Sequence, residues 1–182
     1  MTTGTRRIHQ IHPAWWVLSL SVAALFALNG ARASFAVLYQ PLEEDAGWSR
    51  VSLAGAASLG QLVMGPSFIV AGVAVDRYGP RRVLPVFALL HLAGYLMAAR
   101  ATGVWQVYIG FGLLGGTAFG IGVGPLLAIV ARWFHRYQGL ALGIASSAGQ
   151  VGVVVFSPAV TLLIDGIGWR WTFAFLALLP FA

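Results

Sequence analysis

Long apolar stretches follow one another along this chain, separated by short connections that carry most of its charged residues. Five stretches are near or above the roughly 20 residues that an α-helix needs to cross a hydrocarbon core of about 30 Å. A sixth has only about a dozen residues, so we expect a truncated sixth helix. The stretches cover residues 14–39, 51–75, 83–99, 104–131, 139–164 and 171–182. The pattern predicts an all-α membrane protein, with a cytoplasmic tail over residues 1–13 and a six-helix transmembrane bundle over residues 14–182.

The composition argues against several function classes. Charged residues make up 9% of the chain, against roughly a quarter in ordinary soluble domains. Cysteine is absent and the four histidines are scattered, so we expect no metal ion and no other cofactor, and no catalytic constellation points to an enzyme. The formal net charge is +6, but the arginines form small clusters between the apolar stretches. Because they line no single helix face, we expect no nucleic acid partner.

The arginine clusters predict how the chain is oriented in the membrane. If the amino terminus is cytoplasmic, three arginines fall in outer connections: Arg50, Arg100 and Arg170. Seven then fall on the inner side: Arg6, Arg7, Arg77, Arg81, Arg82, Arg132 and Arg136. Cytoplasmic connections of membrane proteins carry an excess of basic residues. We therefore expect a multi-pass protein of the cell (inner) membrane with a cytoplasmic amino terminus.

Glycine recurs at every fourth position in the middle of the fourth stretch. Residues 110–115 also fit the GxGxxG pattern of dinucleotide-binding sites, but the strand and the acidic residue that give this pattern its meaning are missing. A helix face without side chains lets a neighbouring backbone approach closely, which predicts tight helix packing. The alternative is a groove left open for a substrate. The face consists of Gly112, Gly116, Gly120 and Gly124.

Four polar side chains lie near the predicted centres of different stretches: Asn29, Gln61, Thr117 and Gln150. At that depth, polar groups tend to face the interior of a bundle or a cavity. They therefore predict a shared polar layer that contacts a substrate. The alternative is hydrogen bonding between helices, which contributes about 0.6 kcal/mol per pair. His91 lies near the middle of the third stretch, and we expect a structural role for it.

Arg32 is the one fully charged residue within the five complete stretches. An arginine near the bilayer centre costs at least about 2.5 kcal/mol on insertion scales, so its presence needs a reason. On a continuous helix it shares a face with Asn29 and Tyr39. Its planar guanidinium can donate two parallel hydrogen bonds to a carboxylate, which predicts that this face binds an anion. The alternative is that the long side chain reaches the outer interface.

The connection between the second and third stretches carries glycines, an acid and arginines at fixed spacing: Gly72, Asp76, Arg77, Gly79, Arg81 and Arg82. Gly79 followed by proline favours a turn. The segment resembles the loop between helices two and three of the major facilitator superfamily, which has a GxxxDRxGxRR-like signature. The resemblance implies a twelve-helix fold, with this chain as its amino-terminal six-helix half, and a gating role for the loop. The alternative is that the arginines only enforce topology.

A second inner connection, residues 131–143, resembles the monocarboxylate-porter branch of that superfamily, which includes oxalate/formate-type exchangers. It contains an aromatic pair, the basic residues Arg132 and Arg136, and a Gly-Leu-Ala-x-Gly helix start. The resemblance implies secondary active transport of a small organic anion, a monocarboxylate or an oxalate/formate-like ion, by alternating access. A proton or a counter-anion would be coupled to it. The expected partners are the anion, membrane lipid and the missing carboxyl-terminal six-helix half.

Two other functions stay open. A non-transporting six-helix scaffold, a receptor-like unit or an inactive fragment would also fit a chain that lacks a second half. A facilitator-type efflux pump for a neutral or drug-like substrate is less favoured. The reason is that Ser157 precedes Pro158, where the drug/proton antiporter signature has glycine.

Overall fold

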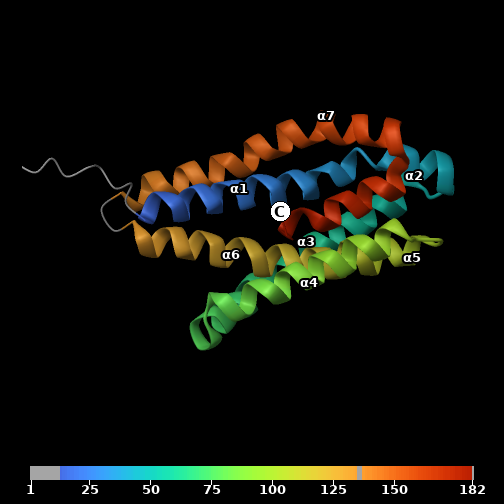
Figure 1. Cartoon of the computed structure of the whole chain (residues 1–182). Coiled ribbons are helices and arrows are strands. Elements are labelled where there is room, and N and C mark those ends of the chain that lie inside the picture. Colours follow the sequence, from blue (N-terminus) through green and yellow to red (C-terminus); the bar gives the residue numbers. More distant parts are fainter. Residues whose placement is uncertain (1–12, 135–136, 182) are drawn as a thin grey trace, which may run out of the picture.

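The computed structural model describes residues 13–134 and 137–181, and this part of the chain folds as a bundle of helices (Figure 1). The predicted all-α fold class is confirmed, since no β-strand occurs within the described residues. Five stretches among them are long and apolar enough to cross a membrane: Trp15–Ala36, Arg50–Tyr78, Pro80–Ala99, Val104–Trp133 and Gln138–Leu178.

The helices in chain order are α1 (Pro13–Ala33), α2 (Tyr39–Ala46), α3 (Arg50–Tyr78), α4 (Pro80–Ala99), α5 (Val104–Val107), α6 (Gly116–Trp133) and α7 (Gln138–Leu178). Short 3₁₀ turns follow α1 and α7, at Ser34–Ala36 and Leu179–Phe181. A wider π-helical segment, Tyr108–Gly115, joins α5 to α6. α5, the π-helical segment and α6 together form one continuous rod of spanning length.

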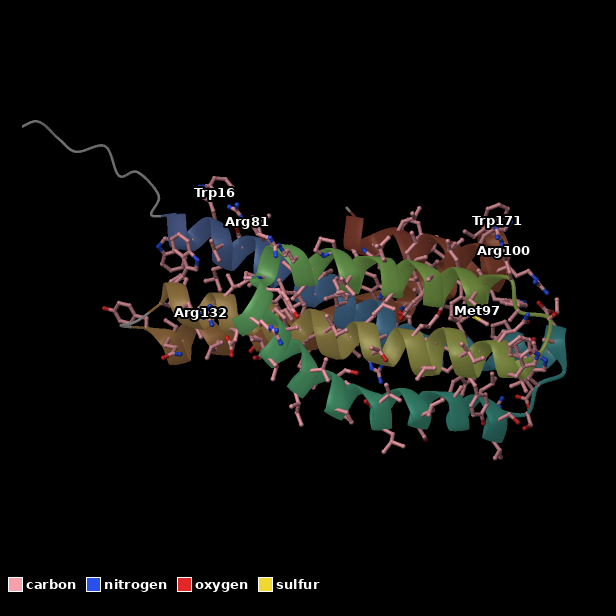
Figure 2. All side chains as sticks on the ribbon, turned by 90° about the horizontal axis from the view of Figure 1, so that it is seen from below. Trp16, Arg81, Met97, Arg100, Arg132 and Trp171 are labelled. Carbon is pink, nitrogen blue, oxygen red and sulfur yellow. The ribbon has the colours of Figure 1, made fainter. Side chains whose placement is uncertain are left out.

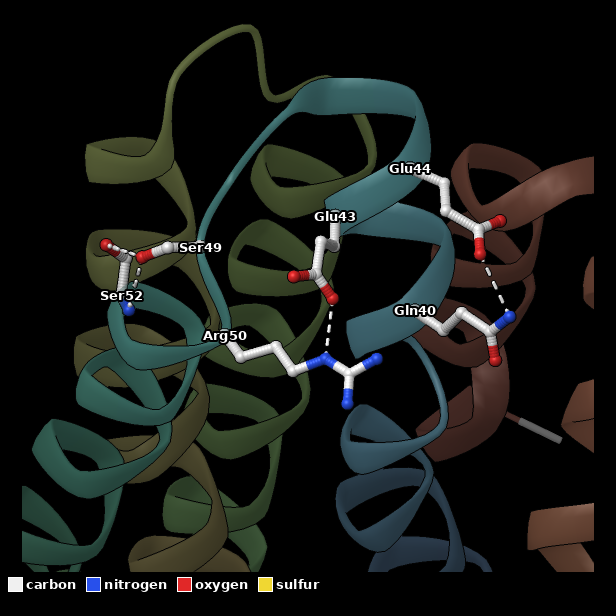
Figure 3. Close-up of polar contacts among 6 residues, drawn as sticks. All are labelled: Gln40, Glu43, Glu44, Ser49, Arg50 and Ser52. Carbon is white, nitrogen blue, oxygen red and sulfur yellow. Dashed lines mark hydrogen bonds and ion pairs between the residues drawn. The ribbon is translucent and has the colours of Figure 1, made fainter.

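The first apolar stretch is broken near its outer end. α1 ends at Ala33, and the chain passes through the 3₁₀ turn into α2, whose sequence is polar. The hydroxyl of Ser34 donates to the carbonyl of Gly30 at 2.7 Å, a bond that often bends helices. Glu43 of α2 pairs with Arg50 at the start of α3, with 2.5 Å between Oε2 and Nε (Figure 3). α2 therefore forms a polar cap at this end of the bundle.

The connection between α3 and α4 is a corner formed by a single residue. Gly79 has a φ of 79°, a left-handed value that a side chain disfavours. Pro80 then begins α4, at a position where its missing N–H is tolerated. As a result, Asp76 and Arg77 lie in the last turn of α3, and Arg81 lies in the first turn of α4. The segment expected as a loop is made of two helix ends.

α7 consists of two arms that meet at Gly168, where φ is 79° and ψ is 164°. The chain reverses direction there, and the second arm returns beside α4 toward the middle of the bundle (Figure 1). On this arm, the carbonyl of Leu176 accepts a hydrogen bond from Nε2 of His91 on α4 at 3.1 Å. His91 is buried and stacks on Tyr95, with ring centres 4.2 Å apart. His91 thus joins α4 to the second arm of α7.

Two helix pairs form the most extensive contacts, α1 with α7 and α3 with α6. Near the capped end, aromatic rings hold the elements together. Phe35, which follows α1, stacks on Phe111 of the π-helical segment with ring centres 3.7 Å apart. Phe173 on the second arm of α7 is fully buried beside both Phe35 and Tyr95. The bundle core is therefore most aromatic beneath α2.

The two ends of the bundle carry different residues. Trp16, Arg81 and Arg132 lie at one end, and Arg100 and Trp171 lie at the other (Figure 2). Tryptophan rings favour the boundary between hydrocarbon and water. The rings of Trp16 and Trp171 are both exposed, as a position at such a boundary requires.

Candidate functional site

A cavity of about 390 Å³ lies between α1, α3, the rod of α6 and the first arm of α7. Four of the polar residues predicted from sequence line it: Asn29, Arg32, Tyr39 and Gln61. The remaining wall is apolar and includes Phe35, Ala57, Met64, Phe111, Phe119 and Val153. The cavity is thus a mostly apolar space with one cation in it.

The guanidinium of Arg32 is held by one polar partner and two rings. Its Nη2 donates to Oε1 of Gln61 on α3 at 2.9 Å. Its Cζ lies 4.9 Å from the ring centre of Phe119 and 6.0 Å from that of Phe111. A cation over an aromatic face is attracted by the ring quadrupole. The side chain is therefore directed into the cavity. A snorkelling side chain would instead have reached the outer interface.

Arg32 forms no ion pair within the described residues. The acids of the chain are elsewhere: Glu43, Glu44 and Asp45 on α2, Asp76 at the end of α3, and Asp165 near the end of the first arm of α7. Gln61 is neutral, so it accepts a hydrogen bond without cancelling the positive charge. No group of three histidine, cysteine or acidic side chains able to hold a metal ion occurs in the described part of the chain. Chemically, the cavity combines one uncompensated positive charge with mostly apolar walls.

Asn29 and Tyr39 lie on either side of Arg32 along the chain. The Nδ2 of Asn29 donates to the carbonyl of Leu25 at 2.9 Å. Tyr39 begins α2, and its ring packs edge-on against Phe35 at 5.3 Å. The predicted continuous α-helical face is interrupted by the 3₁₀ turn, and Tyr39 still lines the cavity.

Tyr39 also lines a second cavity, of about 500 Å³, at the capped end of the bundle. Polar and charged side chains form much of its wall: Gln40, Glu44, Arg50, Thr161 and Asp165. Gln40 donates to Glu44 at 2.9 Å across one turn of α2 (Figure 3). Tyr39 and Ala36 are the residues that line both cavities. Tyr39 therefore stands between the inner cavity and an outer, polar one.

The other two residues predicted for the polar layer lie outside the inner cavity. The hydroxyl of Thr117 donates to the carbonyl of Leu113 at 2.7 Å, and Thr117 lines a separate, apolar hollow of about 370 Å³ between α3 and α6. Gln150 is exposed on the first arm of α7. Depth in the membrane was the reason for predicting both, but depth does not fix the rotation of a helix about its axis.

Phe111 and Phe119 are cavity residues that the sequence reasoning missed. A signal for them was present, because each directly precedes a glycine of the four-residue repeat, Gly112 and Gly120. Residues that flank a packing face are placed at the edge of the space beside it. The rings therefore border the cavity while the glycines contact the next helix.

The glycine repeat faces α3 with backbone against backbone. A Cβ added at Gly116 would lie 2.5 Å from the carbonyl oxygen of Gly60, and one at Gly112 would lie 2.9 Å from that of Ala56. One turn further, a Cβ at Gly120 would lie 2.8 Å from the carbonyl oxygen of Met64. Gly124 differs, since its nearest neighbour is the ring of Phe68 at 3.3 Å.

At the opposite end from α2, Asp76 pairs with Arg132, with 3.1 Å between Oδ1 and Nη2. The pair links the last turn of α3 to the last turn of α6, and both side chains are exposed. Arg77 lies over the ring of Tyr78 at 5.5 Å. Gly72, Arg81 and Arg82 are also exposed. Arg136, the other predicted partner of this connection, lies outside the described residues.

Comparison with known proteins now identifies the family. The model of the Major Facilitator Superfamily matches residues 20–182. The chain belongs to this superfamily. Together with the five apolar helical stretches, this makes it a multi-pass membrane protein. The resemblance that the sequence predicts is confirmed.

Three relatives show the range of proteins that the chain is similar to. Monocarboxylate transporter 11 of Homo sapiens is 30% identical over 159 residues, which are 85% of this chain and 33% of the relative. Riboflavin transporter RibJ of Trypanosoma cruzi (strain CL Brener) is 30% identical over 170 residues, 89% of this chain and 35% of the relative. The Oxalate:formate antiporter of Oxalobacter formigenes is 28% identical over 156 residues, 85% of this chain and 37% of the relative. The chain spans about a third of the length of these relatives.

Proposed function

We propose that the whole protein is a secondary active transporter that carries a small organic anion by alternating access. This chain supplies one six-helix bundle, and a second bundle supplies the opposite wall of the binding site, as in transporters whose halves rock around a central site. A gradient of the anion itself, of protons or of a counter-anion drives transport. The protein moves its substrate without converting it chemically.

The observation that carries the proposal is Arg32 in the inner cavity without a carboxylate partner among the described residues. A guanidinium in a partly dehydrated site attracts an anion, and its fork fits the two oxygens of a carboxylate. Relatives named for monocarboxylate and for oxalate and formate support the same class of substrate. We therefore assign the first contact with the anion to Arg32.

A second candidate is a neutral substrate with an aromatic ring system. It is favoured by the relatives named as riboflavin transporters and by the rings of Phe111 and Phe119 at the cavity wall. Such a ring would stack on the phenylalanines, and Arg32 would donate to a carbonyl oxygen instead of a carboxylate. Uptake of labelled riboflavin is the measurement that separates the two candidates.

The test is uptake of labelled pyruvate, formate, oxalate and riboflavin by the full-length protein in liposomes, normalised to the amount of inserted protein. Arg32→Gln should lower anion uptake at least about tenfold, because a hydrogen bond to a charged group contributes about 1.5–3 kcal/mol. Arg32→Lys should keep part of the activity, since the charge remains but the fork is lost. Arg100→Gln removes one exposed arginine elsewhere and should leave uptake unchanged. Wild-type anion uptake in Arg32→Gln would contradict the proposal.

We also propose that the amino terminus is cytoplasmic and that the protein lies in the cell membrane. These 182 residues contain no cysteine, so a single cysteine introduced at an exposed position reports the side of the membrane when its labelling is compared with that of the unsubstituted protein. A membrane-impermeant maleimide should label Asp45→Cys on α2 in intact cells, and Arg82→Cys only after the membrane is opened. The reverse labelling pattern would invert the assigned orientation.

A further inference from the structure

Gln61 holds the guanidinium of Arg32 in position. The bond between Nη2 of Arg32 and Oε1 of Gln61 joins α1 to α3, and it is the hydrogen bond that the Arg32 side chain makes within the described residues. α1 packs mainly on α7 and α6, whereas α3 packs mainly on α6. The bond therefore crosses the cavity between two helices that meet there through side chains.

The partner of Arg32 is an amide oxygen, and this choice has a chemical consequence. An amide accepts a hydrogen bond but leaves the positive charge of the guanidinium uncompensated. A carboxylate can accept two parallel bonds from the guanidinium and compensates its charge, whereas the amide oxygen accepts one bond and leaves the charge uncompensated. A carboxylate that enters the cavity can thus take the place of the amide oxygen without moving α1 or α3.

The rings and the amide together fix the guanidinium before any ligand arrives. Phe119 lies against it at 4.9 Å from Cζ, and Gln61 holds Nη2. The other donors of the fork make no hydrogen bond within the described part of the chain, and Arg32 lines the cavity. A group that is already oriented loses less conformational entropy when a ligand binds.

Resting on the anion transport proposed above, we propose that Gln61 is a positioning and specificity-determining residue. It occupies the carboxylate position on Arg32 while the cavity is empty and gives this position up to the carboxylate of the substrate. Its neutrality is what keeps Arg32 available. Glutamate at position 61 has the same shape, but it would be a permanent ionic partner for Arg32 and would cancel the charge that attracts the anion.

A purely structural role for Gln61 predicts the opposite order of effects. If Gln61 only linked α1 to α3, glutamate would preserve the link and leucine would break it. Under our proposal, glutamate occupies the site and leucine leaves it open. Gln61→Glu should therefore reduce anion uptake more than Gln61→Leu under our proposal, and less than Gln61→Leu under a purely structural role.

The experiment measures KM and maximal rate for labelled pyruvate, formate and oxalate with the full-length protein in liposomes. Gln61→Glu should raise the KM or lower uptake at least about tenfold, which corresponds to about 1.4 kcal/mol. Gln61→Leu should raise the KM only about threefold at an unchanged maximal rate, because the guanidinium is less well oriented. Gln138→Glu makes the same chemical change at the exposed start of α7 and serves as the matched control.

A charge exchange completes the test. The double variant Arg32→Gln, Gln61→Arg moves the guanidinium from α1 to α3 within the same cavity, and it should recover part of the uptake that Arg32→Gln loses. Anion uptake that is reduced more by Gln61→Leu than by Gln61→Glu would overturn the role of Gln61 while leaving anion transport intact. If the wild type carries none of the three anions, the proposed function fails and the role of Gln61 fails with it.

Discussion

α3 meets its two neighbours across the cavity in opposite ways. Against α6 it presents Gly60 to Gly116, so that the two backbones are in direct contact. Toward α1 it presents Gln61, a long side chain that reaches Arg32 across the cavity. These two positions are adjacent in sequence. A contact between backbones leaves no atom free to move, whereas a contact between side chains can change partner while the helices stay in place.

The difference shows why the binding group lies where it does. A ligand that replaces Gln61 on Arg32 needs no rearrangement of the α3–α6 pair, so that pair can act as a fixed wall. The wall also carries Phe119, one residue before Gly120 of the packing face. The substitutions below separate the fixed contact from the exchangeable one, and they are ordered by the expected effect on stability.

Gly116→Leu should have the largest effect on stability, because the leucine side chain would have to occupy the position of the Gly60 backbone. Overpacking of a helix interface costs about 1–3 kcal/mol or more, and backbone atoms on both sides cannot yield. The amount of folded protein in membranes, measured by fluorescence size-exclusion chromatography, should fall sharply. Gly65→Leu is the control, since a Cβ there meets nothing within 4 Å. Equal loss of folded protein in both variants would show that the α3–α6 contact is no more sensitive to added bulk than an open position.

Two alanine substitutions across the same contact should differ from each other. A Cβ at Gly116 would lie 2.5 Å from the carbonyl oxygen of Gly60, whereas a Cβ at Gly60 would lie 3.3 Å from that of Gly112 and 3.6 Å from Nη2 of Arg32. Gly116→Ala should therefore lower the melting temperature of the purified protein more than Gly60→Ala does. Gly60→Ala should in addition raise the KM for the anion, because its methyl group touches the guanidinium. A raised KM in Gly116→Ala but not in Gly60→Ala would contradict the contact between position 60 and the guanidinium.

Phe119→Leu should change anion binding more than stability. It keeps an apolar side chain at the wall but removes a cation–π contact that contributes about 0.5–2 kcal/mol. We expect the KM for the anion to rise severalfold, with a melting temperature close to that of the wild type. Phe175→Leu changes an exposed ring on the second arm of α7 and should leave the KM unchanged. An unchanged KM in Phe119→Leu would show that the ring of Phe119 does not contribute to anion binding.

Asp76→Asn should have the smallest effect on stability, less than about 1 kcal/mol, because the pair with Arg132 is exposed. Its effect should fall on turnover, since the pair links the ends of α3 and α6 on the side away from the cap. We expect slower transport at an unchanged equilibrium affinity for the anion, measured by uptake and by binding to the purified protein. Asp45→Asn on α2 is the control. Wild-type turnover in Asp76→Asn would leave the pair without a gating role.

The sequence was sufficient for the features that depend on hydropathy and on spacing. Apolar stretches of spanning length predicted the helices, and the four-residue glycine repeat pointed to a face that in the structure meets the backbone of α3. The position of Gly79 before Pro80 predicted the corner between α3 and α4. Each of these follows from local properties of the chain, so no knowledge of the neighbouring helix was needed.

Features that depend on the neighbours could not be predicted in the same way. The break after α1 involves no proline, and it occurs where Ser34 donates to Gly30 and Phe35 stacks on Phe111. Thr117 was predicted from its position near the centre of its stretch, but it lines another hollow than the inner cavity. Gln61 was predicted as a polar residue, but its contact with Arg32 could not be, because the sequence does not say which faces of α1 and α3 point at each other.

The corner at Gly168 has a consequence for how the protein is made. His91 on α4 receives its partner from Leu176, 85 residues later in the chain. Pro180 has no amide hydrogen to offer the carbonyl of Leu176, which accepts instead from the amide of Leu179 and from His91. During synthesis, α4 is therefore made long before the acceptor of its imidazole, and this hydrogen bond can form only after the second arm of α7 has been made. Packing of α4 in this bundle thus depends on a segment that follows it by 85 residues.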